Sequence, residues 1–187
     1  MTNEDETRHA IYVDLRAHYL KAAAYDVAYA RTADTYARYD QSLQTGITVI
    51  TSLTAGGVIG TFLTTDGWPK TTALVLSAIA ALLSAIRQGS NWGGRSEVLR
   101  KQGAAWSAQR EDARDYITRL LTGREVPEEK RTDLKTKIVE LVANNQEVRT
   151  ELYQQCKREK EREFNKEYAF TPLNAPKHSS AANQALA

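Results

Sequence analysis

The sequence predicts an all-α protein in which charged helices flank a charge-poor central segment. Apolar residues recur at helical spacing over most of the chain, and no convincing alternating strand pattern is found. The four prolines occur only at positions 69, 127, 172 and 176, where turns or a tail are expected. Residues 41–86 contain only two charged residues, although 26% of the whole chain is charged. This distribution favours a membrane insert between aqueous helices.

Composition narrows the classes of partner. The net charge is +2 and the basic residues are interleaved with acids, so a nucleic-acid partner is not expected. The single cysteine, Cys156, excludes a disulfide within the chain, and its polar neighbours predict an ordinary position on a helix surface. The acidic N-terminus lacks the apolar region of a cleavable signal peptide.

Residues 5–40 are predicted to form a long N-terminal helix. Steps of three and four residues place a set of mostly apolar side chains on one stripe, which we interpret as a packing seam. The stripe comprises Tyr12, Leu15, Tyr19, Ala22, Asp26, Tyr29, Ala33 and Tyr36. Because no glycine or proline precedes Gly46, this helix is expected to run directly into the charge-poor segment.

The first predicted transmembrane helix covers residues 41–65, which contain no charge. At about 1.5 Å per residue, this length spans a hydrocarbon core of about 30 Å. The segment is rich in Ser and Thr, whose hydroxyls can bond back to carbonyls of their own helix. Gly56 and Gly60 form a GxxxG pair that allows another helix to approach closely.

The second predicted transmembrane helix covers residues 68–92. Trp68, Trp92 and Arg87 are expected to anchor it at the membrane surfaces. Bulky residues fall on one side of the helical wheel, which suits lipid, and small residues fall on the other, which suits helix packing. The predicted packing residues are Ala73, Ser77, Ala81 and Ser84. By the positive-inside rule, flanking bases place both termini in the cytoplasm.

An alternative is a water-soluble bundle, with the two apolar helices at its centre and the amphipathic helices around them. The paired lengths, the short turn at residues 66–70 and the tryptophan positions favour the membrane hairpin.

Residues 95–168 are predicted to form cytoplasmic helices. Leu99, Trp106, Ala113 and Leu120 recur every seven residues, and Thr122-Gly123 provides a stop. One last helix is expected from Pro127 to Tyr168, with an apolar seam that contains Asn145. Such an Asn can fix register between copies, but the seam equally suits packing against the chain's own 95–121 helix. Residues 171–187 are predicted to form a disordered tail.

Little in the sequence indicates chemistry. The three histidines form no metal-ligand or general-base pattern, and the glycines near position 56 do not follow a strand. We therefore expect no catalytic, cofactor-binding or metal-binding residues, and no enzymatic activity.

The arrangement resembles the SLATT family of bacterial proteins with two transmembrane helices. The local likeness is best at Trp92-Gly93-Gly94-Arg95-Ser96-Glu97-Val98-Leu99-Arg100, and the resemblance covers roughly residues 10–165 of a single domain at 1–170. Gly93 and Gly94 depart from the continuous helix expected there. The resemblance implies an effector that disrupts the inner membrane in an anti-phage response signalled by a nucleotide second messenger. It implies no catalytic residues.

A pore is partly supported by the residues themselves. Gln44, Thr48 and Ser52 share one face of the first crossing and are the candidate pore-lining residues, but that face becomes apolar in its outer half. A structural bundle fits the same pattern. One hairpin cannot enclose a channel, so a pore requires a homo-oligomer in membrane lipid. The competing hypothesis is a membrane-anchored scaffold that recruits a cytoplasmic partner without conductance.

Overall fold

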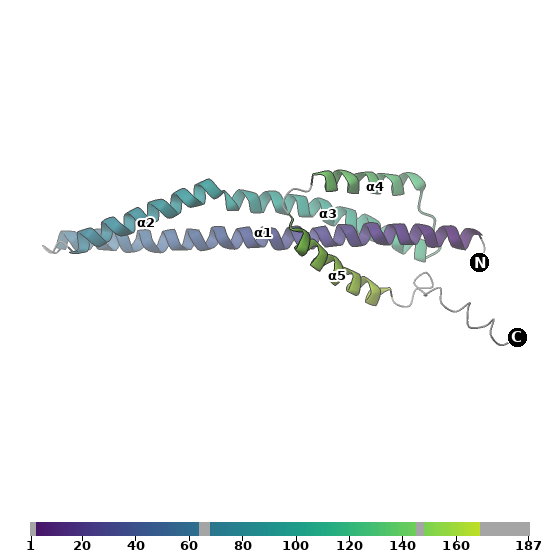
Figure 1. Ribbon diagram of the computed structural model, residues 1–187, viewed down its shortest axis with the longest axis horizontal. Coiled ribbons are helices and arrows are strands. Elements are labelled where there is room, and N and C mark those ends of the chain that lie inside the picture. Colours follow the sequence, from purple (N-terminus) through teal and green to yellow (C-terminus); the bar gives the residue numbers. More distant parts are fainter. Residues whose placement is uncertain (1–2, 64–67, 145–147, 169–187) are drawn as a thin grey trace. The chain divides into compact units, whose positions relative to one another are not determined.

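The computed structural model describes residues 3–63, 68–144 and 148–168, of which residues 3, 56–63 and 68–70 are described by their backbone alone. Five helices occupy these ranges (Figure 1). They are α1 (Asn3–Leu63), α2 (Trp68–Ser90), α3 (Trp92–Leu121), α4 (Glu128–Ala143) and α5 (Thr150–Glu167). The described ranges contain no strand, so the predicted all-α fold is confirmed.

The chain divides into two compact units. The hairpin unit, residues 30–101, contains the second part of α1, all of α2 and the beginning of α3. The bundle unit, residues 1–29 and 102–187, contains the beginning of α1, the rest of α3, and helices α4 and α5. Two helices, α1 and α3, therefore contribute to both units.

The predicted continuation of the N-terminal helix into the first charge-poor segment is confirmed, because α1 has 61 residues. Its N-terminal part buries the predicted stripe: Tyr12, Leu15, Ala22 and Tyr29 are each at most 1% exposed. Additional alanines beside the stripe, among them Ala24 and Ala28, are fully buried. These small side chains let neighbouring helices approach the backbone of α1 closely.

Aromatic contacts join three helices in the bundle unit. The ring of Tyr25 in α1 stacks on Trp106 of α3 with a centroid distance of 4.5 Å, and on Tyr153 of α5 at 4.4 Å. Farther along, Tyr19 meets Phe164 of α5 at 5.2 Å. The predicted seven-residue repeat of α3 faces inward, since Leu99, Trp106, Ala113 and Leu120 are all buried.

The position of Cys156 corrects a sequence-based expectation. Its neighbours in sequence are polar, which predicted a surface site, but the side chain is fully buried against Ala24 and Ala28. The helix α5 is strongly amphipathic, and Cys156 falls on its narrow apolar face with Leu152 and Phe164. A buried thiol behaves as a small apolar side chain, so Cys156 is part of the core.

The predicted stop after α3 is confirmed by its backbone geometry. Gly123 adopts a positive φ of 79°, which favours glycine. The amide of Gly123 donates to the carbonyl of Leu120 at 3.2 Å, and that of Arg124 donates to Arg119 at 2.9 Å. This pair of bonds is a Schellman motif, which satisfies the last carbonyls of the helix. Pro127 then precedes the first residue of α4.

The single helix predicted from Pro127 to Tyr168 is wrong, because α4 ends at Ala143 and α5 begins at Thr150. The break follows Asn144, where φ is −90° and ψ is 5°. Asparagine side chains compete with the helix for backbone hydrogen bonds, and here two of them are adjacent in sequence. The expected continuous seam is therefore divided, with Leu134 and Ile138 buried on α4. Asn145 lies outside the described residues, as does the predicted tail.

Asp26, the one acid of the predicted stripe, has a partner within the chain. Its carboxylate pairs with the guanidinium of Arg110 on α3, which also binds Glu111. Burial raises the pKa of Asp26, while the charges of Arg110 and Lys160 act in the opposite direction. The stripe is thus used for packing inside one molecule.

We expect Trp106→Ala to lower the free energy of unfolding by about 3–5 kcal/mol, because it removes a fully buried indole from the centre of the core. Denaturant titration of the full chain in detergent, followed by far-UV circular dichroism, measures this change. Val139→Ala is the control: Val139 is 58% exposed, and its truncation should change stability by no more than about 0.5 kcal/mol. Equal effects of the two substitutions would contradict the described core.

The raised pKa of Asp26 predicts a pH dependence. The folded state binds the Asp26 proton more tightly than the unfolded state does, so this group stabilises the fold at low pH. That contribution is lost as the pH rises through the folded pKa. Between the unfolded and the folded pKa of Asp26, we expect the free energy of unfolding to depend less on pH in Asp26→Asn than in the wild type. Denaturant titration across a pH series measures this dependence.

Candidate functional site: a charge-poor helical hairpin

The hairpin unit places α2 beside the second part of α1 (Figure 1). The inner side of α2 carries Ala73, which is 8% exposed, and a row of half-buried residues at steps of three and four. This row comprises Leu76, Ala80, Leu83, Ser84 and Arg87. On α1, Gly46 and Ile50 are also half-buried. The less exposed side of α2 thus consists mainly of small and aliphatic side chains, with Arg87 at its end.

The outer side of α2 is apolar and exposed. Leu74 is 72% exposed and Leu82 is 62% exposed, and Val75, Ile79 and Ile86 lie between 41% and 50%. On α1, Val49 and Leu53 are also more than half exposed. Bulky aliphatic side chains concentrated in this way mark a surface that meets lipid or another protein.

One helical stretch of the described chain, Thr71–Leu121, contains a window long and apolar enough to cross a membrane. None of that window is buried inside the molecule. The stretch contains α2 from Thr71 onward and all of α3, and its apolar part lies in α2. The alternative of a soluble bundle required the apolar helices to be covered by the others, and the described residues do not cover α2.

The hydroxyls of α1 bond back to their own helix, as the sequence predicted. Thr45, Thr48 and Ser52 donate to the carbonyls four residues earlier at 2.8–2.9 Å, and Thr51 and Thr54 do the same. Each bond satisfies the hydroxyl proton without water or a neighbouring chain. The hydroxyl groups therefore present fewer free hydrogen-bond donors at the helix surface than the number of Ser and Thr residues implies.

A group of polar and aromatic contacts closes the hairpin where α2 meets α3. Arg87 donates two hydrogen bonds to Asp40 of α1, from Nε to Oδ1 at 2.9 Å and from Nη2 to Oδ2 at 3.1 Å. Its Nη2 also reaches the amide oxygen of Gln44 at 3.3 Å. The hydrogen bonds from Arg87 lower the pKa of Asp40 below its usual range. Beside the pair, Tyr39 and Trp92 meet with ring centroids 5.5 Å apart.

The junction between α2 and α3 is a sharp break at one residue. Asn91 has a φ of 44°, in the left-handed region that Asn tolerates better than most residues. A Cβ on Gly94 would lie 2.7 Å from the amide of Asn91, so glycine accommodates this side chain. The helix is therefore interrupted at Asn91 and not at the two glycines, because Gly93 and Gly94 both belong to α3.

The structure places the predicted site residues unevenly. Ala73 and Ser84 lie toward α1, whereas Ser77 and Ala81 are exposed, so any packing by these two involves something other than α1. The candidate pore-lining residues Gln44, Thr48 and Ser52 are exposed on one face of α1. Around the first two is a shallow hollow of about 370 Å³, lined by Gln41, Gln44, Thr45, Thr48 and Val49. Gly56, Gly60 and Trp68 are described by their backbone alone, so the structure does not test their predicted roles.

Sequence reasoning missed Asp40 and Tyr39, which hold two predicted anchors, Arg87 and Trp92. The signal was present but not specific. Asp40 is the last charged residue before the charge-poor segment, and Arg87 is the first one after Lys70. In an antiparallel hairpin, charges that bound two apolar segments at the same end are brought together.

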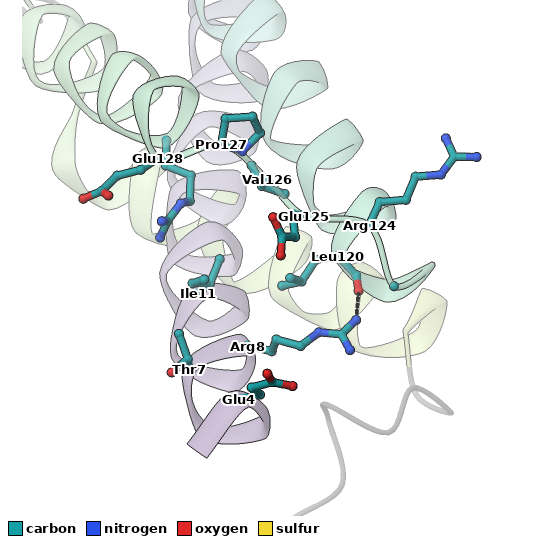
Figure 2. A pocket seen from close by; sticks show the side chains of 12 residues that line it. Glu4, Thr7, Arg8, Ile11, Leu120, Arg124, Glu125, Val126, Pro127 and Glu128 are labelled. Atoms are coloured by element: carbon teal, nitrogen blue, oxygen red, sulfur yellow. Dashed lines mark hydrogen bonds between the residues drawn. The ribbon is translucent and has the colours of Figure 1, made fainter. Parts of the chain in front are cut away.

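A separate pocket of about 650 Å³ lies in the bundle unit, between the start of α1 and the α3–α4 connection (Figure 2). Its charged lining residues are equally divided between Arg8, Arg124, Arg131 and Glu4, Glu125, Glu128. The guanidinium of Arg8 donates to the carbonyl of Leu120 at 2.9 Å and so caps α3 (Figure 2). With balanced charge, the pocket has no excess of positive potential for a phosphate group.

Among the described residues, no group of three or more His, Cys, Asp or Glu side chains is placed to hold a metal ion. Comparisons with family models, curated proteins and solved structures find no match to this chain. The class defined by the fold is an all-α protein with one helix suited to crossing a membrane.

Introducing a charge on the outer face of α2 tests its environment. We expect Leu82→Lys to reduce membrane insertion, because a lysine near the centre of a spanning helix costs about 2.5–3.5 kcal/mol. Alkaline carbonate extraction of membranes, with immunodetection, measures the retained fraction. Leu82→Ala should be retained, and so should Val98→Lys, which places the same charge on an exposed position of α3. If Leu82→Lys stays in the membrane fraction to the same extent as both controls, lipid does not cover this face.

Proposed function

We propose that this chain is a membrane-embedded effector of a bacterial anti-phage response. In this proposal the α1–α2 hairpin spans the inner membrane, copies associate, and the assembly breaches the membrane after a nucleotide second-messenger system is triggered. The observation that carries the membrane part is the exposed aliphatic surface of α2, none of whose apolar window is buried. The breach and its trigger rest on the resemblance to the SLATT family.

Removing this surface from water is favourable by about 25 cal/mol for each Å² of apolar area. The helical backbone supports the same conclusion, since a helix satisfies its own N–H and C=O groups and can enter hydrocarbon without exposing them. In α1, the hydroxyl protons are satisfied in the same way. The low-charge part of the hairpin thus meets both requirements of a bilayer.

The polarity of the two ends supports the proposed orientation. Asp40 and Arg87 neutralise each other at the end next to α3. More basic residues lie near that end than at the α1–α2 connection, where Lys70 is the one base. They are Arg38, Arg95, Arg100 and Lys101. A positive excess favours retention on the cytoplasmic side. Both chain termini would then lie in the cytoplasm, together with the bundle unit.

A pore would need several copies, because a single hairpin encloses no channel. The face of α1 with Gln44, Thr48 and Ser52 is the proposed lining, since it is exposed and more polar than the outer face of α2. The oligomer number is open to measurement by mass in detergent.

A second candidate is a membrane-anchored scaffold that recruits a cytoplasmic partner and conducts nothing. The hydrogen bonds of Thr48 and Ser52 to their own helix favour it, because a hydroxyl whose proton is already bound attracts less water. The two candidates share the membrane hairpin and differ in conductance.

Induced expression in bacteria distinguishes the candidates. If the chain is a pore-forming effector, a potential-sensitive dye should report loss of membrane potential, and Thr48→Asp or Ser52→Asp should alter that loss several-fold. A preserved potential with the protein still in the membrane would support the scaffold.

Thr35→Asp is the matched control. Thr35 is also exposed on α1 and also donates to a carbonyl four residues earlier, but it precedes the charge-poor segment. Its substitution should leave the effect on potential unchanged. If all three substitutions act alike, the effect does not arise from a pore lining.

A further inference from the structure

The ion pair between Asp40 and Arg87 has a geometry that fixes two helices relative to each other. Its two N–H···O bonds, at 2.9 and 3.1 Å, run in parallel from one guanidinium to one carboxylate. A bidentate pair of this kind sets both the separation and the orientation of its two partners. A third bond, from Arg87 to Gln44 at 3.3 Å, extends the contact by one turn of α1.

A second ion pair, which joins α1 to α3, provides a comparison. Asp34 and Arg100 meet through one bond of 3.3 Å, and their side chains are 62% and 63% exposed. For Asp40 and Arg87 the values are 21% and 37%. Exposed single-bond pairs are weak because water screens them. The Asp40–Arg87 pair is the better covered and the better aligned of the two.

The start of α3 lies next to the Asp40 carboxylate. A Cβ on Gly93 would lie 3.5 Å from the Asp40 carboxyl carbon, so the start of α3 packs directly against it. The hydroxyl of Ser96 donates to the carbonyl of Ala33 at 2.9 Å and is buried. The start of α3 is thereby tied to α1 on one side of the Asn91 break, and Arg87 ties the end of α2 on the other.

Apart from Arg87, the buried and half-buried side chains of α2 are mainly small and aliphatic, and they include Ala73, Leu76 and Leu83. In water, such contacts are held together by the hydrophobic effect. In a bilayer that driving force is absent, because lipid is as apolar as the helix surface. A directional polar contact at the membrane surface then has a larger share in holding the two helices together.

We infer that the Asp40–Arg87 pair is a clamp that holds the Arg87 end of α2 against α1, and that loss of the pair lets this end of α2 move away about the break at Asn91. The inference rests on the proposed function in placing the hairpin in lipid. It identifies Asp40 and Arg87 as positioning residues that set the closed form of the hairpin.

Distances between spin labels test the clamp directly. Cysteines at the exposed positions Gln41 and Gln88 report on the clamped end, and cysteines at Leu53 and Leu74 report on the other end. The full chain is labelled in a Cys156→Ala background, reconstituted in phospholipid vesicles and measured by pulsed electron resonance. We expect Arg87→Asp and the neutral Arg87→Gln to lengthen or broaden the first distance by on the order of one helical turn, about 5 Å. The second distance should change less.

The double variant with Asp40→Arg and Arg87→Asp restores opposite charges and should bring the first distance back toward the wild type. The double variant with Asp34→Arg and Arg100→Asp, and each of its single substitutions, should leave both distances unchanged. Unchanged distances in both Arg87 variants, or equal effects at the Asp34–Arg100 pair, would overturn the clamp. If Arg87→Asp fails to reconstitute, Arg87→Gln decides.

This test is separate from that of the proposed function. Carbonate extraction of the wild type reports whether the hairpin enters the membrane, and the dye assay reports whether the membrane is breached. The label distances report only whether the ion pair sets the spacing of α1 and α2. A wild type that extracts as a soluble protein would refute the membrane proposal, while labels on that soluble protein would still confirm or refute the clamp.

Discussion

The unbroken length of α1 is the constraint on which the other contacts depend. Near its start, Tyr19 and Tyr25 of α1 contact Phe164 and Tyr153 of α5. Tyr25 also stacks on Trp106 of α3. Farther along the same helix, Asp40 forms an ion pair with Arg87 of α2. A proline or a left-handed glycine within its first half would interrupt this series of partners. None occurs there, and the run of alanines at positions 22–24 instead favours both helix formation and close packing.

The chemistry of α1 changes along its length, and this change separates the two units. The first part pairs aromatic rings and contains a half-buried ion pair whose carboxylate, Asp26, has a raised pKa. The second part has no charge from Gln41 onward and replaces side-chain pairing with hydroxyl bonds to its own carbonyls. The first pattern suits a protein core beside water. The second removes hydrogen-bond donors from the helix surface, which is what an apolar medium requires.

Periodicity and charge predicted the faces of the helices well. Most of the stripe of α1 and the whole seven-residue repeat of α3 are buried as expected, because side chains at helical spacing share one side of a helix. Cys156 was misjudged because its immediate neighbours are polar, although they lie on other faces of α5. The break at Asn144 depends on a local competition that periodicity does not record. The Asp40–Arg87 pair joins residues 47 positions apart, and only the antiparallel course of α1 and α2 brings them together.

The two sides of α2 explain why the hairpin depends on contacts at its end. Its outer side is bulky and aliphatic, so it gains nothing specific from any one neighbour in lipid. Its inner side presents small residues such as Ala73, which permit a close approach to α1 but do not enforce it. What distinguishes one arrangement from another is therefore concentrated where α2 meets α3. There Arg87 pairs with Asp40, and Trp92 contacts Tyr39. Asn91 interrupts the helix between Arg87 and Trp92. Charges that appear in the sequence as boundaries of an apolar segment thus become, in three dimensions, the contact that determines how that segment is held.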